Sequence, residues 1–259
     1  METVRSKDST PIAYEKSGKG PPLVLVHGTG GDHTRWVPVL PALERHFTVY
    51  AVDRRGRGGS GDTPTYAIER EYEDIVAVVD SIREPVNLLG HSYGALCSLE
   101  AALLTRNIRR LVLYEPAFDV GIPMYPPRSI ERLQTLLDRG DREEMLVAFM
   151  RNIVEMPMHQ IDLLRSEPAW KGRLAAAHTI PREFADADYV LAPQRFSTMN
   201  TPTLLLVGGE SPPILRKPAE ALARVLHNCR VAEMPGQQHV AMSTAPDLFC
   251  RQVISFLTS

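Results

Sequence analysis

Six short apolar runs recur along the chain, and each is followed by helix-like sequence or by a glycine-rich turn. Runs that are apolar throughout, rather than alternating, are typical of strands buried on both faces of a parallel sheet. The intervening segments carry helical spacing, as with Leu96, Leu99 and Leu103 at i, i+3 and i+7. The pattern predicts an α/β fold with a doubly wound, mostly parallel sheet. The runs lie at 21–28, 47–53, 86–92, 109–116, 201–209 and 229–236.

Two segments depart from this alternation. Alternating polar and apolar residues at the N-terminus, with the turn-like "KDST" between them, predict a β-hairpin. The interval 117–195 reads as helices, in which Asp141 and Glu144 resemble a capping pair. We interpret it as a helical cap inserted into one core domain formed by residues 1–116 and 196–259. Since ligands bind beyond the carboxyl ends of the strands in such sheets, the cap would roof the site.

Composition and charge narrow the possible functions. The 259 residues carry a formal net charge of −2, which disfavours binding to a nucleic-acid backbone. The longest apolar runs are far shorter than the ~18–20 residues that span a bilayer, and the N-terminus has no apolar signal-peptide core. The three cysteines share no metal-ligand spacing and favour a reducing cytoplasm. We therefore expect a cytoplasmic protein that acts on a small molecule without nucleic acid or membrane; no pattern indicates its oligomeric state.

The candidate chemistry begins with Gly90–His91–Ser92–Tyr93–Gly94. A Gly-x-Ser-x-Gly pattern is weak evidence by itself, but here it follows a predicted buried strand and precedes a helix with small early residues. A nucleophile at a tight strand-to-helix turn needs this context, because side chains at the flanking glycines would clash. The context favours Ser92 as a nucleophile.

Two further segments could complete such a site. The motif "HGTGG" at 27–31 follows a predicted strand and forms a glycine-rich loop. The backbone amides of Thr29 in this loop and of Tyr93 after the serine are candidates for an oxyanion hole. His239 follows the last predicted strand, at the same edge of the sheet as Ser92. A general base placed there could reach the serine.

Together these motifs resemble those of the α/β-hydrolase-fold superfamily. The similarity rests on the serine pentapeptide, "VHGTGG", "VDRRGRGGSG" at 52–61 and the order serine, acid, histidine, and it covers 20–116 and 200–258. The helical interval then corresponds to the variable cap of the family. The resemblance implies a serine hydrolase that needs no metal or organic cofactor.

Carried over residue by residue, Ser92 resembles the nucleophile and His239 the general base and acid. Thr29 and Tyr93 resemble the oxyanion donors, and Asp53 resembles a residue that fixes a loop.

The triad acid departs from the family pattern. Most members place an aspartate just after the strand that here reads "TLLLVGGESPP", and this position is Ser211, which cannot carry the charge that stabilises an imidazolium. Glu210 beside it and Glu115 at the end of "LVLYEP" remain as substitutes, and some branches of the family take their acid from that earlier strand. A carboxylate closing a strongly apolar strand needs a partner to offset its desolvation. We favour Glu115 over Glu210; a third reading is that Glu115 only supports the cap.

The expected reaction is hydrolysis of a carboxylic ester, or a related lactone or thioester, through an acyl-enzyme on Ser92. A hydrophobic substrate would suit the apolar cap residues, although such residues more often pack against the core. A cofactor-free perhydrolase or haloperoxidase, a carbon–carbon bond hydrolase and an acyltransferase keep the same serine. A ligand sensor without turnover is the alternative from another class. The cap residues considered for the pocket are Met145, Phe149, Met150, Met156, Met158 and Trp170.

Overall fold

An eight-stranded sheet forms the centre of the computed structural model, which describes residues 1–121, 125–184 and 191–259. The spatial order is β1-β2-β4-β3-β5-β6-β7-β8. β1 and β2 form the expected antiparallel hairpin, β2 is also antiparallel to β4, and all other neighbours are parallel. The strands are β1 (Glu2–Arg5), β2 (Pro11–Gly18), β3 (Pro22–Val26), β4 (Thr48–Val52), β5 (Val86–His91), β6 (Ile108–Tyr114), β7 (Thr203–Gly208) and β8 (Cys229–Met234). The predicted doubly wound, mostly parallel α/β sheet is confirmed.

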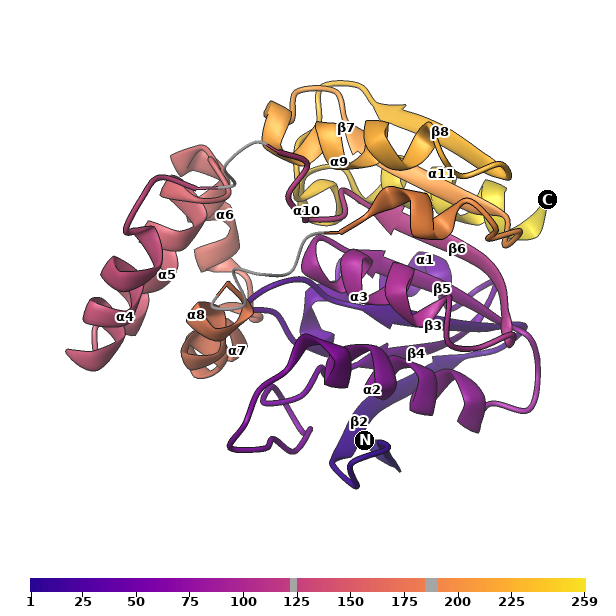
Figure 1. Ribbon diagram of the computed structural model, residues 1–259, viewed down its shortest axis with the longest axis horizontal. Helices are drawn as coiled ribbons and strands as arrows, with labels where there is room; N and C mark the ends of the chain where they lie inside the picture. The colour runs from indigo at the N-terminus through magenta and orange to yellow at the C-terminus, as the bar shows by residue number, and fades with distance from the viewer. Residues whose placement is uncertain (122–124, 185–190) are drawn as a thin grey trace.

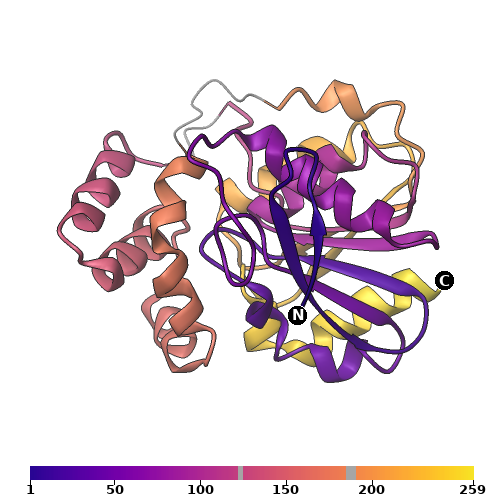
Figure 2. The same cartoon turned by 90° about the horizontal axis from the view of Figure 1, so that it is seen from below.

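Helices cover both faces of this sheet (Figure 2). Successive side chains of a strand point to opposite faces, so Val24 and Val26 of β3 pack in one apolar core and Leu23 and Leu25 in the other. The first core lies under α2, α3 and α9, and the second under α1 and α11. The helices and 3-10 turns of the sheet domain are η1 (His33–Trp36), α1 (Leu40–Leu43), α2 (Ile68–Ser81), α3 (Tyr93–Ala101), η3 (Pro193–Phe196), α9 (Pro213–Ala223), α10 (Ala241–Thr244) and α11 (Pro246–Thr258).

The remaining helices, which we call the cap helices or the cap, form a separate group at one end of the molecule (Figure 1). They lie between β6 and β7 in the chain and share a third apolar core, to which Val240 of the sheet domain also belongs. Parts of the expected cap interval, 122–124 and 185–190, fall outside the described residues. α5 begins directly after Asp141, but the side chain of Asp141 makes no capping hydrogen bond, so the predicted capping pair is wrong. The elements are α4 (Ser129–Asp138), α5 (Arg142–Asn152), α6 (Met158–Ser166), α7 (Trp170–Ala176), η2 (Ala177–Thr179) and α8 (Ile180–Glu183).

Among the described residues, no helix combines the length and the apolar character that crossing a membrane requires.

Candidate active site

Ser92 stands at the turn between β5 and α3, with φ 57° and ψ −123°. Its backbone amide donates to the carbonyl oxygen of Tyr114 on the neighbouring strand, at 2.9 Å. The flanking glycines are required by space: a Cβ at Gly94 would lie 2.3 Å from the carbonyl oxygen of His27, and one at Gly90 would lie 2.5 Å from that of Gly94. The serine is therefore held in a strained turn, as a nucleophile elbow requires.

His239 and Glu115 form a buried pair near this serine. His239 Nδ1 lies 2.6 Å from Glu115 Oε2, and the two residues are 6% and 0% exposed. The other carboxylate oxygen, Oε1, accepts a hydrogen bond from the amide of Gly208 at 2.7 Å. Both oxygens of Glu115 are thus engaged, one by the histidine and one by the end of β7. His239 can keep its Nε2 free for a proton from Ser92 when Nδ1 carries the hydrogen.

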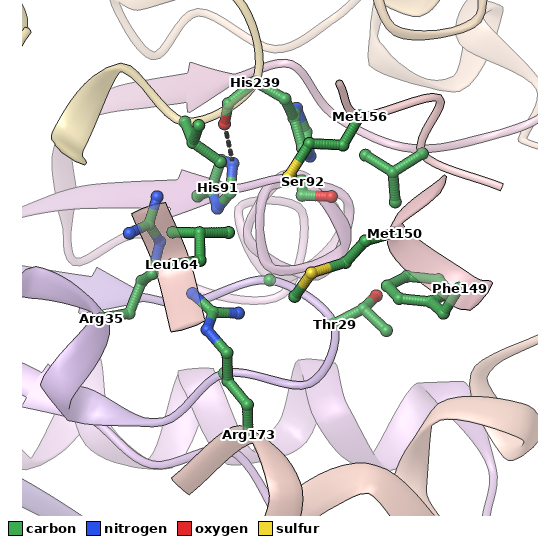
Figure 3. A pocket seen from close by; sticks show the side chains of 14 residues that line it. Thr29, Arg35, His91, Ser92, Phe149, Met150, Met156, Leu164, Arg173 and His239 are labelled. Atoms are coloured by element: carbon green, nitrogen blue, oxygen red, sulfur yellow. Dashed lines mark hydrogen bonds between the residues drawn. The ribbon is translucent and has the colours of Figure 1, made fainter. Parts of the chain in front are cut away.

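The loop that carries His239 is fixed by two side chains from the strands beneath it. The Tyr114 hydroxyl donates to the carbonyl of Gln238 and accepts from the amide of Ala241. His91 Nε2 donates to the carbonyl of His239 at 2.9 Å, shown as the dashed line in Figure 3. Burial, together with the nearby His239, holds the pKa of His91 well below its usual value. His91 is therefore a neutral donor that positions the backbone of His239.

The competing carboxylate lies elsewhere. The side chain of Glu210 is exposed, and the residue is held by its backbone, whose amide donates to Gln237 and whose carbonyl accepts from Gln238. Ser211 is buried, and its hydroxyl has no hydrogen-bond partner among the described residues. The structure brings Glu115, not Glu210, to His239.

The two candidate oxyanion donors border the serine from different loops. Tyr93 is the first residue of α3, so its amide has no acceptor within the helix. Its side chain points away, with its hydroxyl 3.0 Å from that of Tyr66 and its ring under the guanidinium of Arg54. Thr29 lines the pocket that contains Ser92. The approach of its loop is close, because a Cβ at Gly28 would lie 2.8 Å from that of Ser92.

A pocket opens over Ser92 between the sheet and the cap helices (Figure 3). Its cavity measures about 40 Å³, room for a few water molecules rather than for a drug-sized ligand. The sheet side contributes Gly28, Thr29, Gly31, Arg35, His91, Ser92, His239 and Val240. The cap side contributes Phe149, Met150, Val154, Met156, Leu164 and Arg173.

The apolar cap residues divide between two roles. Phe149, Met150 and Met156 line the pocket. Met145 and Trp170 pack within the cap, and Met158 is 41% exposed. Half of the expected set thus faces the site.

One group of potential metal ligands lies beside the pocket, formed by Asp32, His33 and Asp53. Their oxygens already accept internal hydrogen bonds. Asp53 accepts from the amides of His33 and Gly59 and pairs with His33 Nδ1 at 2.8 Å, and Asp32 accepts from the amide of Thr34. The hydrogen bond to Asp53 raises the pKa of His33. These contacts explain the group as a clamp on two loops, in line with the loop-fixing part expected of Asp53.

Two charged pocket residues were not singled out from the sequence. Arg35 lies in η1 and Arg173 in α7, far apart in the chain, yet both border the same cavity as Ser92. Nothing in the spacing around either arginine distinguishes it from a surface cation. Only the docking of the cap on the sheet brings them together.

Comparisons with known proteins match this fold. The model of the alpha/beta hydrolase family matches residues 23–252. An alpha/beta hydrolase from Sphaerobacter thermophilus DSM 20745 superposes with a TM-score of 0.86 and 39% identity, over 99% of this chain and 100% of that one.

Two curated relatives are similar over nearly their whole lengths. Pyrrolizixenacetamide deacetylase of Xenorhabdus hominickii is 28% identical, over 100% of this chain and 98% of the relative. Pimeloyl-[acyl-carrier protein] methyl ester esterase of Vibrio atlanticus (strain LGP32) is 24% identical, over 96% and 98%. With the family model spanning most of the chain and the fold shared throughout, this enzyme belongs to the alpha/beta hydrolase family.

Proposed function

We propose that the protein is a serine hydrolase that cleaves a carboxylic ester, or a related lactone or thioester, of a small molecule. The observation that carries the proposal is the buried hydrogen bond between His239 and Glu115 beside Ser92 in its strained turn. A base oriented by a carboxylate, next to a serine, is the arrangement by which serine is activated. The deacetylase and the methyl ester esterase named above break bonds to an acyl group, which supports this reaction class.

In the proposed reaction, His239 Nε2 takes the proton of the Ser92 hydroxyl as its oxygen attacks the substrate carbonyl. Glu115 stabilises the imidazolium that results through the bond to Nδ1. The amides of Thr29 and Tyr93 bind the tetrahedral oxyanion, each lowering the barrier by ~3–4 kcal/mol. His239 then gives its proton to the leaving alcohol, and water releases the acyl group by the same route.

We assign residues 117–195 the part of a cap on this reaction. Phe149, Met150 and Met156 supply the apolar wall facing Ser92. Since the cavity is only about 40 Å³, the substrate is small or displaces the flexible methionine side chains, which repack readily.

Labelling and turnover test the proposal together. A fluorophosphonate should label the wild-type enzyme at Ser92, detected as a mass shift on the peptide that contains it. Short p-nitrophenyl esters should be hydrolysed by the wild type and not by Ser92→Ala. A folded wild-type protein that neither reacts with the probe nor turns over any ester, lactone or thioester in a graded series would refute the proposal.

A further inference from the structure

Two arginines share the pocket with the nucleophile. Arg35 is 3% exposed and Arg173 is 6% exposed, and both line the cavity over Ser92. Figure 3 shows their guanidinium groups on the side of the pocket opposite Phe149. One comes from the sheet domain and the other from the cap, so the pair exists only when the cap is seated.

The positive charge of this pair is incompletely balanced. Arg35 Nη1 donates to Ser243 at 2.7 Å and lies 3.7 Å from a carboxylate oxygen of Glu167, but its Nη2 has no partner among the described residues. Arg173 forms no ion pair within 4.0 Å with any described residue, and its buried Nε has no partner there. Glu167 and Asp32 attract Arg173 only over a longer distance.

Such an arrangement is costly without a ligand. A buried charge loses several kcal/mol of hydration that only a close partner restores. Burial, reinforced by repulsion from Arg35, lowers the pKa of Arg173 to about 10. The side chain therefore stays protonated near neutral pH, and two cations face one small cavity. Buried polar groups almost always have a hydrogen-bond partner, so the unpartnered nitrogens of both arginines favour a partner that enters this cavity.

The shape of the two guanidinium groups indicates which ligand would bind them. A guanidinium is a planar fork that matches a carboxylate in two parallel hydrogen bonds. A carboxylate group is also small enough for the cavity, and its negative charge would balance the positive charge of Arg35 and Arg173. Phe149 and Met150 offer only apolar contact to the remainder of the ligand.

We propose that the substrate carries a free carboxylate, held by Arg35 and Arg173, in addition to the acyl bond attacked by Ser92. The inference rests on the proposed function and names its substrate class: a half-ester or lactone of a small dicarboxylic acid, or an ester whose leaving group is itself an acid. The expected hydrophobic substrate is thereby replaced by an anionic one with a short apolar stretch.

Matched esters test the inference. On the acyl side, p-nitrophenyl hemisuccinate is compared with p-nitrophenyl levulinate, in which a methyl group replaces the carboxylate oxygen; the spontaneous rate of each is subtracted. On the leaving side, 4-acetoxybenzoate is compared with its methyl ester. We expect kcat/KM to favour the anionic member of at least one pair by about tenfold or more, the scale of a charged hydrogen-bonded contact. Preference for the neutral member of both pairs would overturn the inference.

Variants locate the preference. Arg173→Gln should bring the ratio of anionic to neutral kcat/KM close to one, through a higher KM for the anionic ester. The exposed Arg165, also in the cap and paired with Glu143, provides the control, and Arg165→Gln should keep the wild-type ratio. An equal ratio in wild type and Arg173→Gln would contradict the assignment. Where Arg173→Gln does not fold, Arg35→Gln takes its place.

A binding measurement separates this inference from the proposed function. Glutarate should raise the Tm of the wild-type enzyme, and glutaramide, its uncharged analogue, should not. If esters are not hydrolysed but glutarate still stabilises the protein, the reaction is wrong and the anion site stands. If esters are hydrolysed but glutarate and glutaramide act alike and no anionic ester is preferred, the anion site is wrong.

Discussion

Glu115 reaches His239 across the sheet, at 2.6 Å, from the end of β6. Its backbone adopts φ 45°, in the left-handed region that non-glycine residues occupy at a cost of ~1–2 kcal/mol. The bond from the amide of Gly208 holds the carboxylate in that conformation. Strain retained at a buried carboxylate, and stabilised by the next strand, is typical of a functional position.

Glu115→Gln should lower kcat by about 10⁴-fold, the effect of holding a triad histidine in the wrong tautomer. The glutamine amide has nearly the same shape as the carboxylate, but it carries no charge to stabilise an imidazolium. Its NH₂ can also donate to Nδ1 of His239, which would place the hydrogen on Nε2 and leave no base facing Ser92. Steady-state kinetics with a p-nitrophenyl ester would measure the loss, with circular dichroism to verify that the variant is folded.

The matched control is Glu210→Gln, which changes the rival carboxylate in the same way. Because Glu210 is exposed, its kcat should stay within a few fold of the wild type. The opposite ranking of the two variants would show that His239 takes its acid from the end of β7.

Short sequence motifs predicted which residues meet at most of this candidate site. They missed the contacts that depend on how distant segments pack together. Ser92, Thr29 and His239 each follow a strand end, and a parallel sheet brings such ends to one edge, so their convergence could be expected from the chain alone. The choice between Glu115 and Glu210 depends on which carboxylate lies within hydrogen-bond distance of His239. Tertiary packing sets that distance, so the sequence alone left the choice open. Arg173 belongs to a cap helix whose docking no periodicity encodes.

Gly94→Ala should unfold or inactivate the protein. A Cβ there would lie 2.3 Å from the carbonyl oxygen of His27, a backbone atom directly after β3 that cannot retreat without moving the end of that strand. Gly140→Ala is the comparison, since a Cβ at Gly140 meets nothing within 4 Å and the change costs only the left-handed backbone, ~1–2 kcal/mol. Urea unfolding of both variants would measure the difference; equal losses would mean that the elbow has room for a side chain.

Glu183→Gln should loosen the cap. Glu183 of α8 lies 2.7 Å from Arg54 and also contacts Arg57, and all three side chains are buried. Removing one partner of a buried ion pair costs up to about 3–5 kcal/mol. In Glu183→Gln the two arginines would share a single carboxylate, that of Glu71, so one positive charge would be uncompensated. Asp62→Asn breaks the more exposed pair with Arg182 and should cost at most about 1 kcal/mol.

The readout for the cap is unfolding by urea together with limited proteolysis of residues 125–184. Both pairs join α8 to the sheet domain, so faster cleavage there in Glu183→Gln than in Asp62→Asn would show that the buried contact is the one that holds the cap. If the two variants lose equal stability, the network of Arg54 and Arg57 does not hold the cap.

The contact between His33 and Asp53 should stabilise the protein less as the pH rises. The hydrogen bond to Asp53 raises the pKa of His33, with Asp32 and Glu15 adding to the effect. A raised pKa means that folding favours the protonated ring, so the contribution is complete below the ordinary histidine value of ~6.5 and is lost as pH rises through the folded pKa. The free energy of unfolding of the wild type and of His33→Gln, measured from pH 5.5 to 9, should therefore differ most at the acidic end and converge as the ring deprotonates. A gap of constant size across that range would mean that His33 contributes as a neutral hydrogen-bond donor and not through its charge.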